Sequence, residues 1–141
     1  MKKIALYVAW IQATVATAGS LYFSYVLHWT PCELCWLQRI FIFPLAVILA
    51  VAIIKEIKDI EYIVLPLTFI GIAISIYHNL LQDGVIPEKF AICSAGVSCT
   101  IPYHLFFNFL TVPLLSLLAL LVITACMFLY HYAKKKETIP V

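Results

Sequence analysis

The chemistry that is easiest to recognise in this chain lies in two cysteines, Cys32 and Cys35, which form a Cys-x-x-Cys motif. The short spacing allows the two sulfur atoms to form a disulfide, and a position at the start of a helix lowers the pKa of a cysteine toward the nucleophilic thiolate. Arg39 follows Cys35 by four residues, so both side chains lie on one helix face. A cation there stabilises a thiolate or an anion that develops on a bound acceptor. These residues predict thiol–disulfide redox chemistry.

A second pair of cysteines, Cys93 and Cys99, precedes the last apolar stretch of the chain. As a disulfide, this pair either staples its loop or exchanges with the first pair, passing electrons through mixed disulfides. The fifth cysteine, Cys126, lies inside an apolar stretch, and we interpret it as a small core residue.

Other roles for the Cys32/Cys35 pair fit the sequence less well. An inert disulfide is the simplest alternative, but so short a bridge closes too small a loop to stabilise the fold much through chain entropy. A zinc site needs two more ligands at metal-binding spacing, which the sequence does not show, so no metal site is predicted. Haem attachment requires a histidine where Trp36 stands.

The composition indicates that these cysteines belong to an integral membrane protein. Of the 141 residues, 65% are hydrophobic and only 11% are charged. A soluble domain of this length cannot bury so much apolar surface. The net charge of +2 is small and the basic residues lie at segment ends, so no nucleic-acid partner is expected.

Four apolar stretches are long enough to cross a bilayer, so we predict an all-α, four-helix membrane bundle that forms a single domain over residues 1–141. The predicted spans cover about residues 4–27, 36–54, 62–81 and 105–130. In the first span, small residues recur every four positions at Ala9, Ala13 and Thr17, which predicts a close contact with another helix on that face.

The lysines at the segment ends indicate how the bundle is oriented. Seven of them fall on the side of the two termini: Lys2, Lys3, Lys55, Lys58, Lys134, Lys135 and Lys136. Because Lys89 is the only lysine in the opposite loops, the positive-inside rule predicts that both termini are cytoplasmic. The outer loops at about residues 28–35 and 82–104 then hold both cysteine pairs where disulfides persist. The first apolar run continues to Trp29, too long for a signal-peptide core, so we expect it to be retained.

Two polar residues near the outer end of the third span are further candidates for a binding site. His78 and Gln82 are four residues apart, on one helix face and at about the depth of Arg39 in the second span. Polar side chains in membrane bundles also join helices by hydrogen bonds, and this structural role stands as the alternative.

Taken together, the sequence resembles the DsbB/BdbC family of disulfide-bond-forming membrane oxidoreductases. Nearly the whole chain takes part, through Pro31-Cys32-x-Leu34-Cys35-x-x-x-Arg39, His78-x-x-Leu81-Gln82 and the outer cysteine pair before the last span. The resemblance implies a protein of the bacterial cell membrane that reoxidises a soluble thioredoxin-like thiol oxidase outside the cytoplasm. It also implies that the electrons pass to a quinone of the membrane pool, ubiquinone or menaquinone.

The resemblance assigns a role to each candidate residue. The partner's thiolate would attack Cys93, with Cys99 as its disulfide mate, and Cys32 would exchange with this outer pair. Cys35 would be the thiolate that contacts the quinone ring. Gln38 stands where many family members have an acid, so no proton-relay role is assigned to it. The quinone head group would be lined by Arg39, His78 and Gln82.

Two alternatives of other kinds stay open. A vitamin K epoxide reductase-like enzyme shares four spans and quinone chemistry, but its Cys-x-x-Cys lies near the last span, whereas here it opens the second. A non-enzymatic four-span scaffold would use its disulfides only to stiffen outer loops. The scaffold predicts bridges that resist mild reduction, and the enzyme predicts ready exchange.

Overall fold

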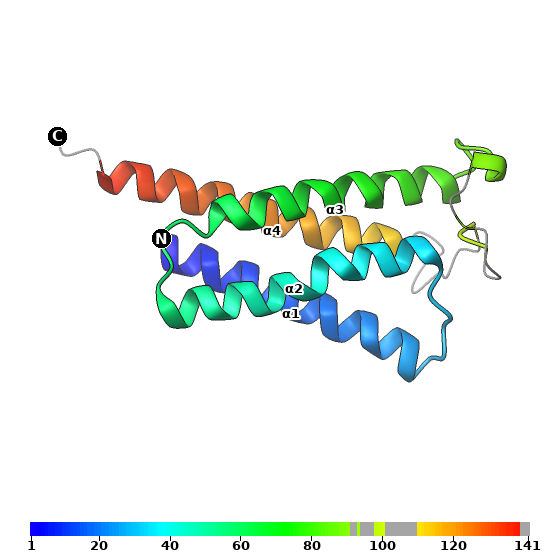
Figure 1. Cartoon of the computed structure of the whole chain (residues 1–141), viewed down its shortest axis with the longest axis horizontal. Helices are drawn as coiled ribbons and strands as arrows, with labels where there is room; N and C mark the ends of the chain where they lie inside the picture. Colours follow the sequence, from blue (N-terminus) through cyan, green and yellow to red (C-terminus); the bar gives the residue numbers. More distant parts are fainter. Residues whose placement is uncertain (91–92, 94–97, 101–109, 139–141) are drawn as a thin grey trace.

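The computed structural model describes residues 1–90, 93, 98–100 and 110–138. Four long helices run alongside one another in this part of the chain (Figure 1), and each is long and apolar enough to cross a membrane. They are α1 (Lys2–Tyr25), α2 (Glu33–Lys55), α3 (Glu61–Gln82) and α4 (Val112–Thr138), with a short 3-10 turn at Glu88–Phe90. The predicted all-α membrane bundle is confirmed.

The ends of α2 follow from local hydrogen bonding. Cys32 has an extended backbone and accepts a hydrogen bond at its sulfur from the Cys35 N–H at 3.4 Å, which caps the helix N-terminus. At the other end Glu56 takes a left-handed conformation with φ of 49°, and the Ile57 N–H donates to the Ala52 carbonyl at 3.1 Å. The Cys-x-x-Cys motif therefore forms the cap and first turn of α2.

α4 begins at Val112, with Pro113 in its first turn. The N–H groups of the first turn have no partner within the helix, so proline, which lacks an N–H, costs no helical hydrogen bond there. Leu110 and Thr111 precede the helix. The predicted fourth span begins at about residue 105, and residues 101–109 lie outside the described part of the chain.

Small residues allow the helices to approach closely. Ala9 and Ala13 are completely buried, which confirms the predicted contact face of α1 at these positions, and the Thr17 hydroxyl donates to the Ala13 carbonyl at 2.8 Å. In α3, a Cβ atom at Gly71 would lie 3.0 Å from Cδ1 of Leu120 in α4. The absence of a side chain at Gly71 thus lets the side chain of Leu120 in α4 pack directly against the backbone of α3.

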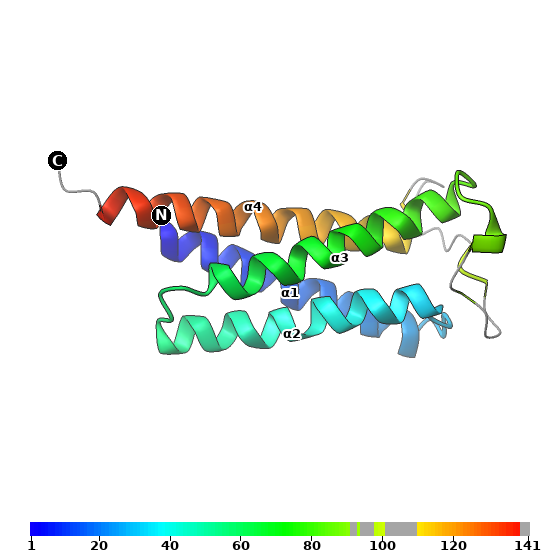
Figure 2. The same ribbon diagram turned by 45° about the horizontal axis from the view of Figure 1, so that its top comes forward.

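Ion pairs join the two termini to the turn between α2 and α3. Lys2 pairs with Glu137 near the C-terminus, and Lys134 Nζ lies 2.5 Å from Asp59 and 2.9 Å from the buried carboxylate of Glu61. The termini and this turn therefore share one end of the bundle. The cysteine-bearing segments lie at the other end, as two views of the ribbon show (Figures 1 and 2).

Candidate active site

The two thiols of the Cys-x-x-Cys motif face each other at the start of α2. Their sulfur atoms are 2.9 Å apart, close enough for a thiol hydrogen bond. Cys32 is buried and Cys35 is half-buried. Because the cap geometry fixes the backbone between them, the pair is held at the spacing that disulfide formation requires.

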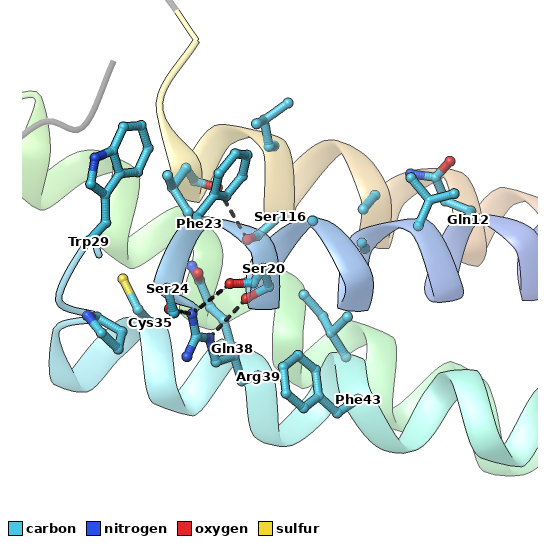
Figure 3. Close-up of a pocket in the computed structure, with 18 of the residues that line it drawn as sticks. Gln12, Ser20, Phe23, Ser24, Trp29, Cys35, Gln38, Arg39, Phe43 and Ser116 are labelled. Carbon is cyan, nitrogen blue, oxygen red and sulfur yellow. Dashed lines mark hydrogen bonds between the residues drawn. The ribbon is translucent and has the colours of Figure 1, made fainter. Parts of the chain in front are cut away.

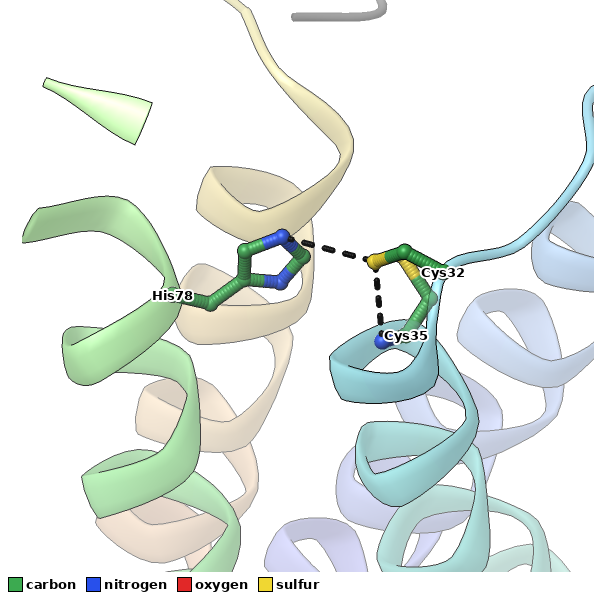
Figure 4. A group of neighbouring side chains, drawn as sticks. All are labelled: Cys32, Cys35 and His78. Atoms are coloured by element: carbon green, nitrogen blue, oxygen red, sulfur yellow. Dashed lines mark hydrogen bonds between the residues drawn. The ribbon is translucent and has the colours of Figure 1, made fainter. Parts of the chain in front are cut away.

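His78 of α3 meets this pair from the neighbouring helix. Its ring is 1% exposed, its Nε2 lies 3.7 Å from the sulfur of Cys32 (Figure 4), and its Nδ1 lies 3.4 Å from Nε2 of Gln38. The hydrogen bond from the Cys35 thiol, together with the contact to His78, lowers the pKa of Cys32 below its ordinary value, although burial opposes this shift. The contacts that stabilise a thiolate therefore converge on Cys32, whereas the resemblance implies the reactive thiolate at Cys35.

Arg39 is held by α1 rather than turned toward lipid headgroups. Its Nε donates to Ser20 Oγ at 2.8 Å and its Nη2 to the Ser20 carbonyl at 3.0 Å, with a further hydrogen bond to Ser24 Oγ (Figure 3). The guanidinium carbon also lies 5.1 Å from the ring centre of Trp36. This arrangement satisfies the buried donors and holds the charge between α1 and α2.

A cavity of about 250 Å³ opens beside these residues. Cys35, Gln38 and Arg39 line it from α2, and the ring of Trp29, stacked on Phe23 with centroids 5.4 Å apart, stands at the end near the α1–α2 turn (Figure 3). The rest of the lining comes mainly from apolar and small residues of α1, α2 and α4, among them Val15, Ala16, Gly19, Ile42, Phe43, Leu115 and Ala119. As far as the described residues show, the site is thus an apolar chamber with one thiol and one cation in its wall.

The outer cysteine pair lies against the inner one. Cys93 and Cys99 form a disulfide with Cα atoms 6.1 Å apart, and Cys99 is only 2% exposed. Cys99 shares a small buried cluster with Cys32, and Cys35 and Cys93 pack against that cluster. Among the described residues, the fold therefore gathers both pairs at one place, one as a disulfide and the other as a dithiol.

The structure divides the predicted quinone-contacting residues into two groups. Arg39 lines the cavity, but neither His78 nor Gln82 is among the described residues that do so. His78 instead contacts the dithiol, and Gln82 is the last residue of α3, one turn beyond it.

Three residues of the site were not predicted from the sequence. Gln38 joins His78 to the cavity wall, and Ser20 and Ser24 hold Arg39. Their spacing could have indicated them, because residues three or four apart share a helix face. Gln38 follows Cys35 by three residues, and the two serines are four residues apart near the end of the first span.

Known proteins that are similar in sequence to this chain are named for disulfide formation. Residues 2–129 match the family model described as disulfide bond formation protein DsbB. Disulfide bond formation protein C of Bacillus subtilis is 40% identical over 138 residues, which cover 94% of this chain and 96% of that protein. A probable disulfide formation protein of Deinococcus radiodurans is 38% identical over 143 residues, covering 96% of this chain and 92% of its own.

A third relative, probable disulfide formation protein C 1 of Bacillus anthracis, is 38% identical over 128 residues, covering 91% of this chain and 92% of its own. No solved structure shows a significant match to the chain. The family match covers α1, α2, α3 and α4 as far as residue 129, and it includes the Cys-x-x-Cys motif, Arg39 and both outer cysteines. The chain therefore belongs to the DsbB family of multi-pass membrane oxidoreductases that function in disulfide-bond formation.

Proposed function

We propose that this protein reoxidises a soluble thioredoxin-like thiol oxidase outside the cytoplasm and passes the electrons to a membrane quinone, ubiquinone or menaquinone. The observation that carries the proposal is the position of Cys35, whose thiol lines an apolar cavity together with the guanidinium of Arg39. A quinone has an apolar body and carbonyl groups that gain negative charge on reduction, so it requires an apolar chamber, a thiol donor and a cation.

The cavity fits the head group of such a molecule. A cavity of roughly 150 Å³ accommodates benzene, so a volume of about 250 Å³ has room for the single substituted ring of a benzoquinone head group such as that of ubiquinone, whereas the two fused rings of a menaquinone need more space. Arg39 and Gln38 would hold the carbonyl oxygens, and when bound the quinone supplies a two-electron acceptor. Val15 lines the cavity and is also exposed on the side of α1, so the chamber reaches the lipid-facing surface from which a long isoprenoid tail would extend.

The two cysteine pairs would then act as a relay. The partner's dithiol reduces the Cys93–Cys99 disulfide and becomes a disulfide itself. The outer dithiol next reduces a Cys32–Cys35 disulfide, which restores the outer bridge and leaves two electrons and two protons on the inner pair. The burial of Cys99 in one cluster with Cys32 supports this exchange, and the arrangement seen, an outer disulfide with an inner dithiol, corresponds to the stage just before the electrons leave.

His78 would act on the inner pair rather than on the quinone. With Nε2 at 3.7 Å from Cys32, the imidazole can accept the thiol proton or donate a hydrogen bond to the thiolate. Gln38 holds the ring from its other nitrogen and fixes its orientation. In this proposal His78 keeps Cys32 ready for exchange while Cys35 faces the acceptor.

Gly19 provides a direct test that the cavity is the quinone site. A Cβ atom at Gly19 would meet nothing within 4 Å, because the residue borders the cavity, so Gly19→Phe fills the chamber without disturbing the packed core. In anaerobic single-turnover reduction of short-chain quinones by the pre-reduced variant, we expect the quinone concentration that gives half the maximal rate to rise at least about tenfold, equivalent to ~1.4 kcal/mol.

The matched control is Gly19→Ala, which leaves most of the cavity open and should behave much like the wild type. Dithiol exchange at Cys32 and Cys35, followed by thiol alkylation, should be the same in all three proteins. Unchanged quinone kinetics in Gly19→Phe would place the quinone elsewhere.

A further inference from the structure

We propose that the reduced Cys32–Cys35 pair and His78 form a binding site for a thiophilic divalent cation such as Zn²⁺, and that the bound ion blocks oxidation of the dithiol. The proposal goes beyond the oxidoreductase function and needs neither a quinone nor a protein partner. It rests on three donor atoms that the fold brings together from α3 and from the N-terminal end of α2.

The geometry of the three donors is close to that of a zinc site. The two sulfur atoms and Nε2 of His78 all lie within 4.8 Å of one another. In a tetrahedral site, the usual Zn–S and Zn–N bond lengths place a sulfur and a nitrogen ~3.6 Å apart, and the separation of Cys32 Sγ from His78 Nε2 is 3.7 Å. The same bond lengths place two sulfurs ~3.8 Å apart, so the present 2.9 Å requires only a small side-chain rotation at the half-buried Cys35.

The ligand set also suits the ion chemically. Two thiolates and one imidazole are ligands that Zn²⁺ prefers, and three protein ligands with an open fourth position are typical of non-structural zinc sites. Binding replaces two thiol protons by the cation, so two protons are released and the thiolate charges are neutralised in this mostly buried place. From the sequence alone, the further ligands of a zinc site are missing, because His78 is distant along the chain.

Gln38 supplies the outer contact that such a histidine needs. A metal-binding imidazole must offer the lone pair of one nitrogen, and its other N–H is normally held by an acceptor. Gln38 lies 3.4 Å from Nδ1 of His78, and an amide can present either its oxygen or its NH₂ group there. The ring can therefore turn its Nε2 lone pair to the metal without leaving a buried N–H unpaired.

The redox state of the pair controls the site. Oxidation joins the two sulfurs in a disulfide and removes two of the three ligands, so the oxidised protein cannot hold the ion. Conversely, the bound ion holds both thiolates and prevents them from transferring their electrons. The ion would thus act as a reversible inhibitor of the reduced enzyme, relieved by a chelator.

Cadmium binding to the full-length protein in detergent tests the proposal, because thiolate–Cd²⁺ charge-transfer absorption reports sulfur ligands directly. A Cys93→Ser/Cys99→Ser background removes the outer thiols as competing ligands. Under anaerobic conditions, we expect the reduced protein to bind one Cd²⁺ per chain, with Zn²⁺ displacing it, and the oxidised protein to bind none. Equal binding by the reduced and oxidised forms would overturn the proposal, and this comparison requires no further substitution.

Matched variants identify the ligands. In this background, His78→Gln should weaken Cd²⁺ binding at least about tenfold, since removal even of an outer-shell contact costs that much. His131→Gln, at the other end of the bundle, and Cys126→Ser should bind as the parent does. If His78→Gln and His131→Gln bind alike, the histidine is not a ligand and the site is refuted. In the wild type, Zn²⁺ should slow quinone reduction and a chelator should restore it; the binding results can be read even if no quinone is reduced.

Discussion

At the scale of single residues, the site is built around a half-buried cation, Arg39, and a thiol pair in which Cys32 is buried and Cys35 is half-buried. A charge within a membrane-spanning helix is costly unless its donors are satisfied, and Arg39 meets this condition through Ser20 and Ser24 of α1. The same contacts hold the guanidinium at the cavity wall, next to Gln38 and Cys35. The charge is therefore positioned before an acceptor binds, as electrostatic stabilisation of developing charge requires.

Removal of the two serine hydroxyls should loosen this arrangement. In the Ser20→Ala/Ser24→Ala variant, Arg39 keeps its charge but loses two hydrogen bonds of the charged type, each worth roughly 1.5–3 kcal/mol where buried. We expect a fivefold or greater rise in KM for quinone in steady-state assays. Ser116→Ala is the control, because Ser116 lines the same cavity but bonds within its own helix. A variant with the kinetics of this control would show that the serines do not position Arg39.

The residue-scale chemistry could be predicted only in part. Cys32, Cys35 and Arg39 stand out because their spacing on one helix is a local property. The contacts of His78 are not local, because its distance to Cys32 depends on how α3 packs on α2. Sequence spacing within α3 predicts that His78 and Gln82 share a helix face, but it does not predict which residues of other helices contact that face. Nothing in the sequence around Ser20 and Ser24 marks them as site residues, because their role depends on the contact with Arg39 of another helix.

At the scale of elements, close packing of small residues places the site. Ala13 of α1 is completely buried, and its small side chain lets α1 approach its neighbours. That approach brings Ser20 and Ser24, about two and three turns further along α1, within reach of Arg39 on α2. Helix packing in the middle of the bundle thus determines the geometry of the cavity at its end.

A larger side chain at Ala13 should therefore cost both stability and site geometry. For Ala13→Leu we expect a loss of about 1–3 kcal/mol in the free energy of unfolding, as overpacked cores show. Thermal or denaturant unfolding in detergent measures the effect. The control is Thr14→Leu, which puts the same side chain at the adjacent exposed position of α1. Equal stability of the two variants would mean that the α1 contact tolerates expansion.

The helices themselves were largely predictable, because four long apolar runs allow few other structures in a membrane protein. The residues at which the helices begin and end were less predictable. α2 begins at Glu33, three residues before the predicted span, because Cys32 caps it, and such a cap depends on backbone geometry that a hydropathy pattern does not contain. The consequence is functional, since the cap places both thiols on the helix end.

At the scale of the whole molecule, the bundle separates two ends of different chemistry. Lysine ion pairs gather at the end that holds the termini, and the cysteine pairs gather at the other. With the positive-inside rule, this separation predicts cytoplasmic termini and extracytoplasmic cysteines.

Labelling of single introduced cysteines in intact bacteria tests this orientation. In a cysteine-free chain, Val85→Cys near the active end should react with a membrane-impermeant maleimide from outside, since Val85 is 67% exposed. Lys3→Cys, near the N-terminus, should react only after the membrane is permeabilised. The reverse pattern would place the active cysteines in the cytoplasm and exclude an extracytoplasmic partner.

The most direct test of the central claim is anaerobic quinone reduction by the purified protein, driven by a reduced thioredoxin-like dithiol protein. We predict that the wild type and Cys126→Ser reduce one quinone per dithiol oxidised, and that Cys35→Ser and Cys93→Ser both fail. Full turnover by Cys93→Ser would contradict the two-pair relay. Absence of any dithiol-dependent reduction by the wild type, with its disulfides intact, would contradict quinone-linked oxidation itself.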